Sequence, residues 1–133
     1  MISVADTISA ISEEKALSLF QAVALSENDN TNVLITKLRL NSRQRYSRIE
    51  KLMHVGLIRR INGKYSLTSF GRIVFSILIK VENAIKYYWK LKAIDSILLS
   101  SDRKELPPHE YQMIIYKLID NHEIKAILVS DEF

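Results

Sequence analysis

The sequence predicts a mainly α-helical protein with one small β-hairpin. Apolar residues recur three and four positions apart along most of the 133 residues, and one Asn-Gly dipeptide separates two short strand-like runs. With 47% hydrophobic and 26% charged residues the composition is that of a globular protein. A chain of this length buries about two-thirds of its unfolded surface, so we expect a core that needs no metal or crosslink.

The first two expected helices lie before residue 41. Ser12 is followed by two acidic residues, which is typical of an N-cap, and apolar residues at helical spacing extend the first helix to about Ser26. After a polar turn, Thr31 or Asn32 can cap a short second helix. Asn41 and the serine after it then interrupt the helical pattern.

A third helix is expected over residues 42–54, and Gly56 stands where a left-handed helix terminator belongs. Its apolar residues repeat at three and four positions and define the inward face: Tyr46, Ile49, Leu52 and Met53. Residues 57–67 then form the expected hairpin, called the wing below. Its turn is Asn62-Gly63, which tolerates the positive φ angles of a type I′ turn.

A fourth helix, capped by Thr68 or Ser69, is expected to run from Phe70 to about Leu99 because its apolar pattern continues without a proline. This helix is longer than so small a domain needs, so we expect its second half to form a homodimer interface. The interface residues follow a near-heptad spacing: Val81, Ala84, Tyr88, Leu91 and Leu98.

The C-terminal residues are expected to form a linker and a helical segment that packs on the same core. Pro107-Pro108 can begin a helix, whose buried face comprises Tyr111, Ile114, Ile115, Leu118 and Ile119. Residues 121–130 could form a helix or a strand, and Asn121 as a cap favours the helix. The expected domains are residues 1–72, the dimerisation helix 73–99 and the segment 100–133.

Charge is concentrated in one part of the chain. Residues 37–64 contain nine basic residues and one acidic residue, so this block has a net charge of +8 within a chain of net charge +4. Three helices, a hairpin and a further helix are the order of a winged helix-turn-helix, and the basic block falls on its second and third helices and its wing. This coincidence predicts a surface that binds the phosphates of nucleic acid.

The expected DNA-binding residues belong to three parts of this block. On the outward face of helix 42–54 they are Arg43, Gln44, Ser47, Arg48 and Lys51, with Arg45 at the flank facing phosphate. In the wing they are Arg59, Arg60 and Lys64, and on the second helix Lys37 and Arg39. A helix fits the major groove, where Arg and Gln bind guanine and adenine edges, and the wing reaches the backbone or the minor groove.

These stretches resemble the archaeal winged-helix transcription regulators, whose layout is close to that of MarR-type and ArsR-type proteins. The similarity runs through residues 43–49, 52–60 and 63–71, and continues more weakly through residues 88–94 and 118–121. The resemblance implies sequence-specific binding of double-stranded DNA and control of transcription. It also implies that residues 43–51 form the recognition helix and that residues 59–64 belong to the wing. It indicates neither an operator sequence nor an effector.

Enzymatic functions find little support in the sequence, and we expect a non-enzymatic protein with no cofactor. His109-Glu110 and His122-Glu123 begin like a zinc-protease helix, but Met113 and Ala126 stand where the second histidine belongs. The absence of cysteine removes thiolate chemistry and agrees with a cytoplasmic location. The most apolar stretch is shorter than the about 20 residues that a membrane span needs, so no membrane partner is expected.

A different function remains open for the same scaffold. A winged-helix protein-interaction module would dock an acidic partner in a transcription or repair assembly, and its basic face would then meet carboxylates instead of phosphates. Strong salt-dependent binding to naked duplex DNA separates the first function from the second.

Overall fold

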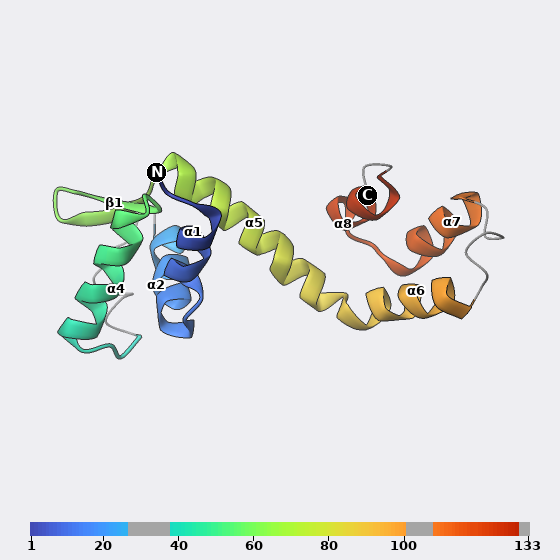
Figure 1. Cartoon of the computed structure of the whole chain (residues 1–133), viewed down its shortest axis with the longest axis horizontal. Helices are drawn as coiled ribbons and strands as arrows, with labels where there is room; N and C mark the ends of the chain where they lie inside the picture. Colours follow the sequence, from blue (N-terminus) through green and yellow to red (C-terminus); the bar gives the residue numbers. More distant parts are fainter. Residues whose placement is uncertain (27–37, 101–107, 131–133) are drawn as a thin grey trace. The chain divides into compact units, whose positions relative to one another are not determined.

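The computed structural model describes residues 1–26, 38–100 and 108–130, and it divides the chain into two compact units, Met1–Ile77 and Leu78–Phe133. Its elements, in chain order, are α1 (Val4–Ile11), α2 (Glu14–Leu25), α4 (Ser42–His54), β1 (Ile58–Ile61), β2 (Lys64–Leu67), α5 (Ser69–Lys86), α6 (Tyr88–Ser100), α7 (Pro108–Leu118) and α8 (His122–Val129) (Figure 1). The protein is therefore mainly helical with one two-stranded hairpin, as expected, and this order is compatible with a winged-helix layout. Most of the expected second helix lies outside the described residues, and its expected end is wrong, because Leu38 and Arg39 form a turn.

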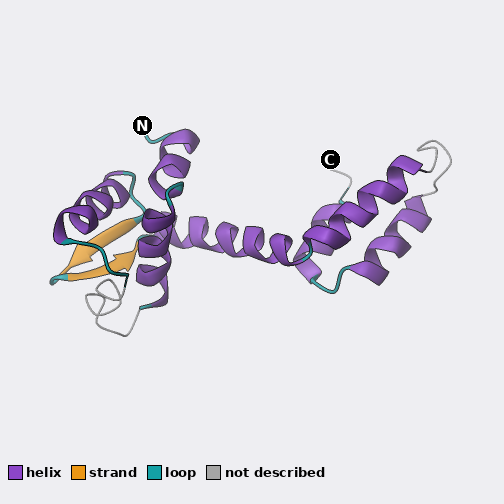
Figure 2. Ribbon diagram, turned by 90° about the horizontal axis from the view of Figure 1, so that it is seen from below, coloured by secondary structure: helices purple, strands orange, loops and turns teal. Residues whose placement is uncertain are grey.

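The core of the first unit forms where α2, α4 and the base of the hairpin meet (Figure 2). The largest side chains that are fully buried there are Leu19, Phe20, Val23, Leu52 and Leu57. Phe75 from the start of α5 lies edge-on to Phe20, with 6.2 Å between ring centroids. Removal of this aliphatic and aromatic surface from water is the main force that holds α4 and the hairpin in place.

The N-terminus forms an additional helix that the apolar pattern did not predict. Ser12, expected as the cap of the first helix, is the C-cap of α1, and α2 begins two residues later at Glu14. The cap of α1 is Ser3, whose hydroxyl accepts from the Asp6 amide while the Asp6 carboxylate accepts from the Ser3 amide, both at 3.0 Å. The hydrogen bond that the Ser3 amide donates to the carboxylate, together with hydrogen bonding from the Ser3 side chain, lowers the pKa of Asp6 below its ordinary value.

Helix α4 has the bounds expected from the sequence, but its buried face is different. Ile49 and Leu52 are buried as predicted, whereas Tyr46 is 64% exposed and Met53 40% exposed, so their inward assignment is wrong. The helix is rotated about its axis so that Arg48 lies beside α2, where it pairs with Glu13. Burial of Ile49 and Leu52 fixes this orientation, and the ion pair lies at the edge of the same interface.

The hairpin has the predicted turn. Strands β1 and β2 are antiparallel, with Ile58 opposite Leu67 and Ile61 opposite Lys64. Asn62 has φ of 54° and Gly63 has φ of 75°, the two positive angles that a type I′ turn requires. Ile58 and Leu67 are buried, so the base of the wing is part of the core while its tip is exposed.

A close backbone approach joins the end of α4 to the start of α5. The Thr68 hydroxyl accepts from the Gly71 amide at 2.9 Å, so Thr68 is the cap of α5, and its own amide donates to the Leu57 carbonyl at 3.2 Å. A Cβ atom added to Gly71 would lie 2.0 Å from the Leu57 carbonyl oxygen. The glycine is therefore required by packing.

The expected single helix from Phe70 to about Leu99 is in fact two helices, α5 and α6, separated by a turn at Tyr87. The Tyr87 amide donates to the carbonyl of Ala84, three residues earlier, at 3.1 Å, which tightens the chain locally. Tyr87 also packs against the core of the second unit. Neither proline nor glycine marks this break, so no residue type in the sequence indicated it.

The second unit has its own core, formed by Ile94, Ile115, Ile119 and Ile124. Helix α7 begins at Pro108, and the residues of its expected buried face lie in or against this core. The Asn121 side chain accepts from the Ile124 amide at 3.0 Å and caps α8, which confirms that this segment is helical. In the described ranges, no helix is long and apolar enough to cross a membrane.

Candidate nucleic-acid interface

The solvent-facing side of α4 carries a row of polar and basic side chains. Arg43, Ser47 and Lys51 are all exposed and follow one another at intervals of four residues, so they occupy one face of the helix. Glu50 and Tyr46 are exposed beside this row, and Tyr46 was not among the expected DNA-binding residues. Its exposure follows from the rotation of α4, which apolar spacing alone did not reveal.

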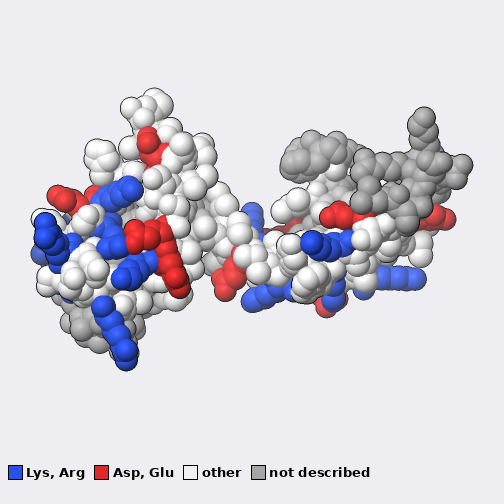
Figure 3. Space-filling model, turned by 60° about the horizontal axis from the view of Figure 1, so that its bottom comes forward, with Lys and Arg blue, Asp and Glu red and all other residues white. Residues whose placement is uncertain are grey.

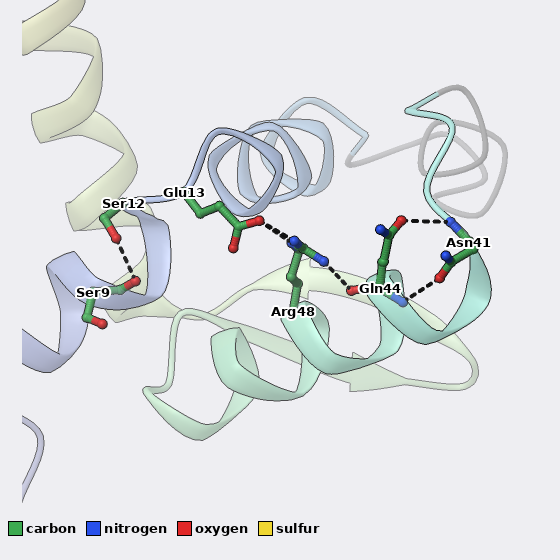
Figure 4. Close-up of polar contacts among 6 residues, drawn as sticks. All are labelled: Ser9, Ser12, Glu13, Asn41, Gln44 and Arg48. Atoms are coloured by element: carbon green, nitrogen blue, oxygen red, sulfur yellow. Dashed lines mark hydrogen bonds and ion pairs between the residues drawn. The ribbon is translucent and has the colours of Figure 1, made fainter.

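Two of the expected groove-reading side chains are held by other parts of the protein (Figure 4). The Gln44 side chain accepts from the Asn41 amide at 3.3 Å, and the Gln44 amide donates to the Asn41 side chain at 2.8 Å. These bonds form the capping box of α4. Gln44 therefore stabilises the N-terminus of the helix that presents Arg43.

Arg48 links α4 to α2. Its Nε atom donates to the Glu13 carboxylate at 3.1 Å, a second guanidinium nitrogen pairs with the same oxygen, and a third donates to the Gln44 carbonyl at 3.1 Å. The Arg48 side chain is only 19% exposed. Arg48 thus positions α4 on α2, and Arg45 on the same side of α4 is half-buried as well.

The wing presents its basic residues on two faces, because side chains alternate across a strand. Arg59 lies opposite Ser66, and its Nε atom donates to the Ser66 hydroxyl at 3.4 Å. Arg60 points to the other face, where its guanidinium lies 5.7 Å from the ring centroid of Tyr65. Both arginines and Lys64 near the turn are exposed, so the wing carries positive charge on both of its faces.

The basic residues of the first unit gather on a shared surface. Figure 3 shows Lys and Arg side chains close together on one face of this unit, with acidic side chains beside them. We use the name basic face for the exposed basic residues of α4 and the wing: Arg43, Lys51, Arg59, Arg60 and Lys64. Arg39 is also exposed, in a left-handed conformation with φ of 56°, whereas Lys37 lies outside the described residues.

The expected dimer residues are divided between two environments. Val81 is 50% exposed and Tyr88 is 48% exposed, whereas Ala84 and Leu91 pack against the core of the second unit. Ile85, four residues after Val81, is 66% exposed and was not among the expected residues. The side chain of Leu98 lies outside the described part of the chain.

The described residues contain no group of three or more His, Asp or Glu side chains that could hold a metal ion. His54, at the C-terminal end of α4, is exposed and close to the carbonyl end of the helix, where a cation is favoured. Comparisons of the chain with protein-family models, with curated proteins and with solved structures found no match.

Proposed function

We propose that this protein binds double-stranded DNA in a sequence-specific manner and regulates transcription. The observation that carries this proposal is the exposed row of Arg43, Ser47 and Lys51 on α4, which is followed directly by the positively charged wing. In this proposal α4 enters the major groove, and the wing contacts the backbone or the minor groove.

The chemistry of the row suits base recognition. An exposed arginine can donate two parallel hydrogen bonds to a guanine edge, and serine and lysine can bind bases or phosphates. The capping box and the Glu13 pair hold α4 rigid, so Arg43 is presented without the cost of ordering the helix on binding. Each basic residue that meets a phosphate adds a salt-dependent contribution to the affinity.

A two-fold homodimer would give the protein two recognition helices. Val81 and Ile85 leave an exposed apolar strip on α5, which a second copy can cover. Such a dimer would bind two half-sites about 34 Å apart or a multiple of that spacing. Sedimentation of the protein without DNA tests this part. The parent protein should sediment as a dimer, and the double variant Val81→Glu/Ile85→Glu should sediment as a monomer.

The test of DNA binding is fluorescence anisotropy with a pool of short duplexes, selected for tight binders and repeated over a salt series. We expect one duplex sequence to be enriched, and we expect Arg43→Ala to lose the preference for it. The affinity for this duplex should fall by orders of magnitude between low and physiological salt. Lys64→Ala should weaken all duplexes alike. Unchanged selectivity in Arg43→Ala, or binding that is insensitive to salt, would refute the proposal.

A protein-docking module is the second candidate function. The exposed side chains of Tyr46 and Met53 favour it, because exposed aromatic and methionine side chains are common where proteins bind partners. An acidic partner would then occupy the basic face. Weak duplex binding without base preference, combined with retention of an acidic peptide that Tyr46→Ala releases, would support this function over DNA binding.

A further inference from the structure

The segment Lys86–Lys92 in the second unit combines aromatic and basic residues at high density. Its seven residues include three lysines and three aromatic residues, and the chain has no acidic residue between Glu82 and Asp95. The residues concerned are Lys86, Tyr87, Tyr88, Trp89, Lys90 and Lys92. The DNA-binding proposal places no DNA contact in this segment, in which Tyr88 and Leu91 were expected at the homodimer interface. The segment lies in a different unit from the basic face.

The three rings of this segment have different environments. Tyr87 packs against the core of the second unit, whereas Tyr88 is 48% exposed and Trp89 is 77% exposed. The rings of Tyr88 and Trp89 lie edge to face, with 5.4 Å between their centroids. The turn at Tyr87 therefore fixes one ring in the core and leaves the next two rings together on the surface.

The lysines lie over or beside these rings. The ammonium group of Lys92 is 5.2 Å from the Tyr88 centroid and 5.8 Å from the Trp89 centroid, and that of Lys90 is 5.5 Å from the Tyr87 centroid. Lys86 is exposed at the end of α5. Positive charge and flat aromatic surface are thus adjacent, held by cation–π attraction and by the geometry of one helical turn.

We propose that the segment Lys86–Lys92 is a binding site for single-stranded nucleic acid. Bases stack on Trp89 and Tyr88, and the phosphates between them bind the ammonium groups of Lys86, Lys90 and Lys92. A single strand offers both partners at once, whereas a duplex hides the faces of its bases. The ammonium group of Lys92 can move from the rings to a phosphate when a base takes its place.

Other partners fit the observations less well. An acidic peptide would pair with the lysines but would not need two adjacent exposed rings. A bilayer surface would take up the rings, but α6 carries Asp95 and Ser96 on exposed positions soon after them, so its apolar surface is short. A single strand therefore accounts for the rings and the lysines together.

The test uses the full-length protein and its own fluorescence, because Trp89 is the only tryptophan in the chain. Oligothymidine of about eight nucleotides, which is within the range that one single-strand site covers, is titrated against the protein. Stacking of a base on the indole should quench the Trp89 emission, and added salt should reverse the quenching. Heparin, which has charge without flat bases, and vesicles of anionic phospholipid serve as comparison probes.

Variants test whether the binding takes place at this segment. Their affinity for a labelled oligonucleotide is measured by fluorescence anisotropy. Trp89→Ala should weaken binding about tenfold or more, as expected for the loss of one stacked base. Lys92→Gln should weaken it less and reduce the salt dependence by about one phosphate contact. Lys125→Gln is the matched control, because it removes a lysine that lies 5.1 Å from the Tyr116 ring in the same unit, and it should have little effect.

Several results would overturn the proposal. The proposal is wrong if oligothymidine does not quench the Trp89 emission, or if heparin quenches it as much as oligothymidine does. It is also wrong if Trp89→Ala binds the oligonucleotide as tightly as the parent protein does. A blue shift of the Trp89 emission with vesicles, without a response to the oligonucleotide, would assign the segment to membrane surfaces. A shift of this emission with protein concentration alone would assign the segment to self-association. Arg43→Ala should leave oligothymidine binding unchanged, so failure of duplex binding and failure of this site are distinguishable.

Discussion

Gly71→Ala tests whether the close approach between the starts of the wing and of α5 holds the first unit together. The added Cβ would lie 2.0 Å from the carbonyl oxygen of Leu57, 3.0 Å from its carbonyl carbon and 3.3 Å from the Thr68 hydroxyl. Ordinary contacts between heavy atoms are about 3.5 Å or longer. The backbone must therefore separate by about 1.5 Å, a shift that the rigid hydrogen-bonded turn does not absorb easily.

The size of the effect is a balance of two contributions. Alanine favours a helix over glycine by up to about 1 kcal/mol. Overpacking costs about 1–3 kcal/mol, and separation also weakens the hydrogen bond from the Thr68 amide to Leu57, a further loss of about 1 kcal/mol. We expect a net destabilisation of about 2 kcal/mol, which lowers the unfolding temperature of a unit this size by roughly 8–16 °C.

Amide hydrogen exchange of the wing, together with thermal unfolding followed by circular dichroism, measures this effect. Exchange in β1 and β2 should accelerate in Gly71→Ala, because the base of the wing loses its contact with α5. Ser76→Ala is the control, since it places alanine at an exposed position of the same helix without a clash. If Gly71→Ala is as stable as the parent protein, the argument from the close approach is wrong.

Three further predictions follow from individual polar contacts. Thr68→Val removes the cap of α5 and should cost about 1 kcal/mol in unfolding free energy, measured by urea denaturation; an unchanged midpoint would contradict the capping role. Glu13→Gln removes the carboxylate that holds Arg48 and should reduce stability by less than about 1 kcal/mol and weaken duplex binding in anisotropy, because α4 loses a contact that holds it on α2; unchanged or tighter binding would argue against this positioning role of Arg48. The carboxylate of Asp6 stabilises α1 when charged, and its lowered pKa means that this contribution is lost as the pH falls through a value below 3.8; an NMR titration midpoint at or above 3.8 would contradict the cap geometry.

Local signals in the sequence were sufficient for several elements. Asn62-Gly63 predicted the type I′ turn because few other dipeptides accept two positive φ angles, and Asn121 predicted the cap of α8. Each of these features depends on the conformational preference of one or two residues, which neighbouring elements hardly change.

Features that depend on contacts between distant residues were predicted less well. Helix α1 was missed although Val4, Ile8 and Ile11 stand at helical spacing, because the segment has only eight residues and its capping box at Ser3 was not recognised. Tyr46 was assigned to the buried face of α4, although it is exposed. Its spacing to Ile49 is helical, but spacing alone leaves the rotation of an amphipathic helix uncertain by about one residue.

By itself, the sequence determined the helical class, the hairpin and the block of positive charge between residues 37 and 64, because composition, period and turn chemistry are local properties. Only the tertiary structure decided which charges are available to a partner. It ties Arg48 to a carboxylate 35 positions away, and it leaves Arg43 exposed on the same helix. It also divides the long helix at Tyr87, whose ring packs against the core of the second unit, a contact that no local signal in the sequence indicates.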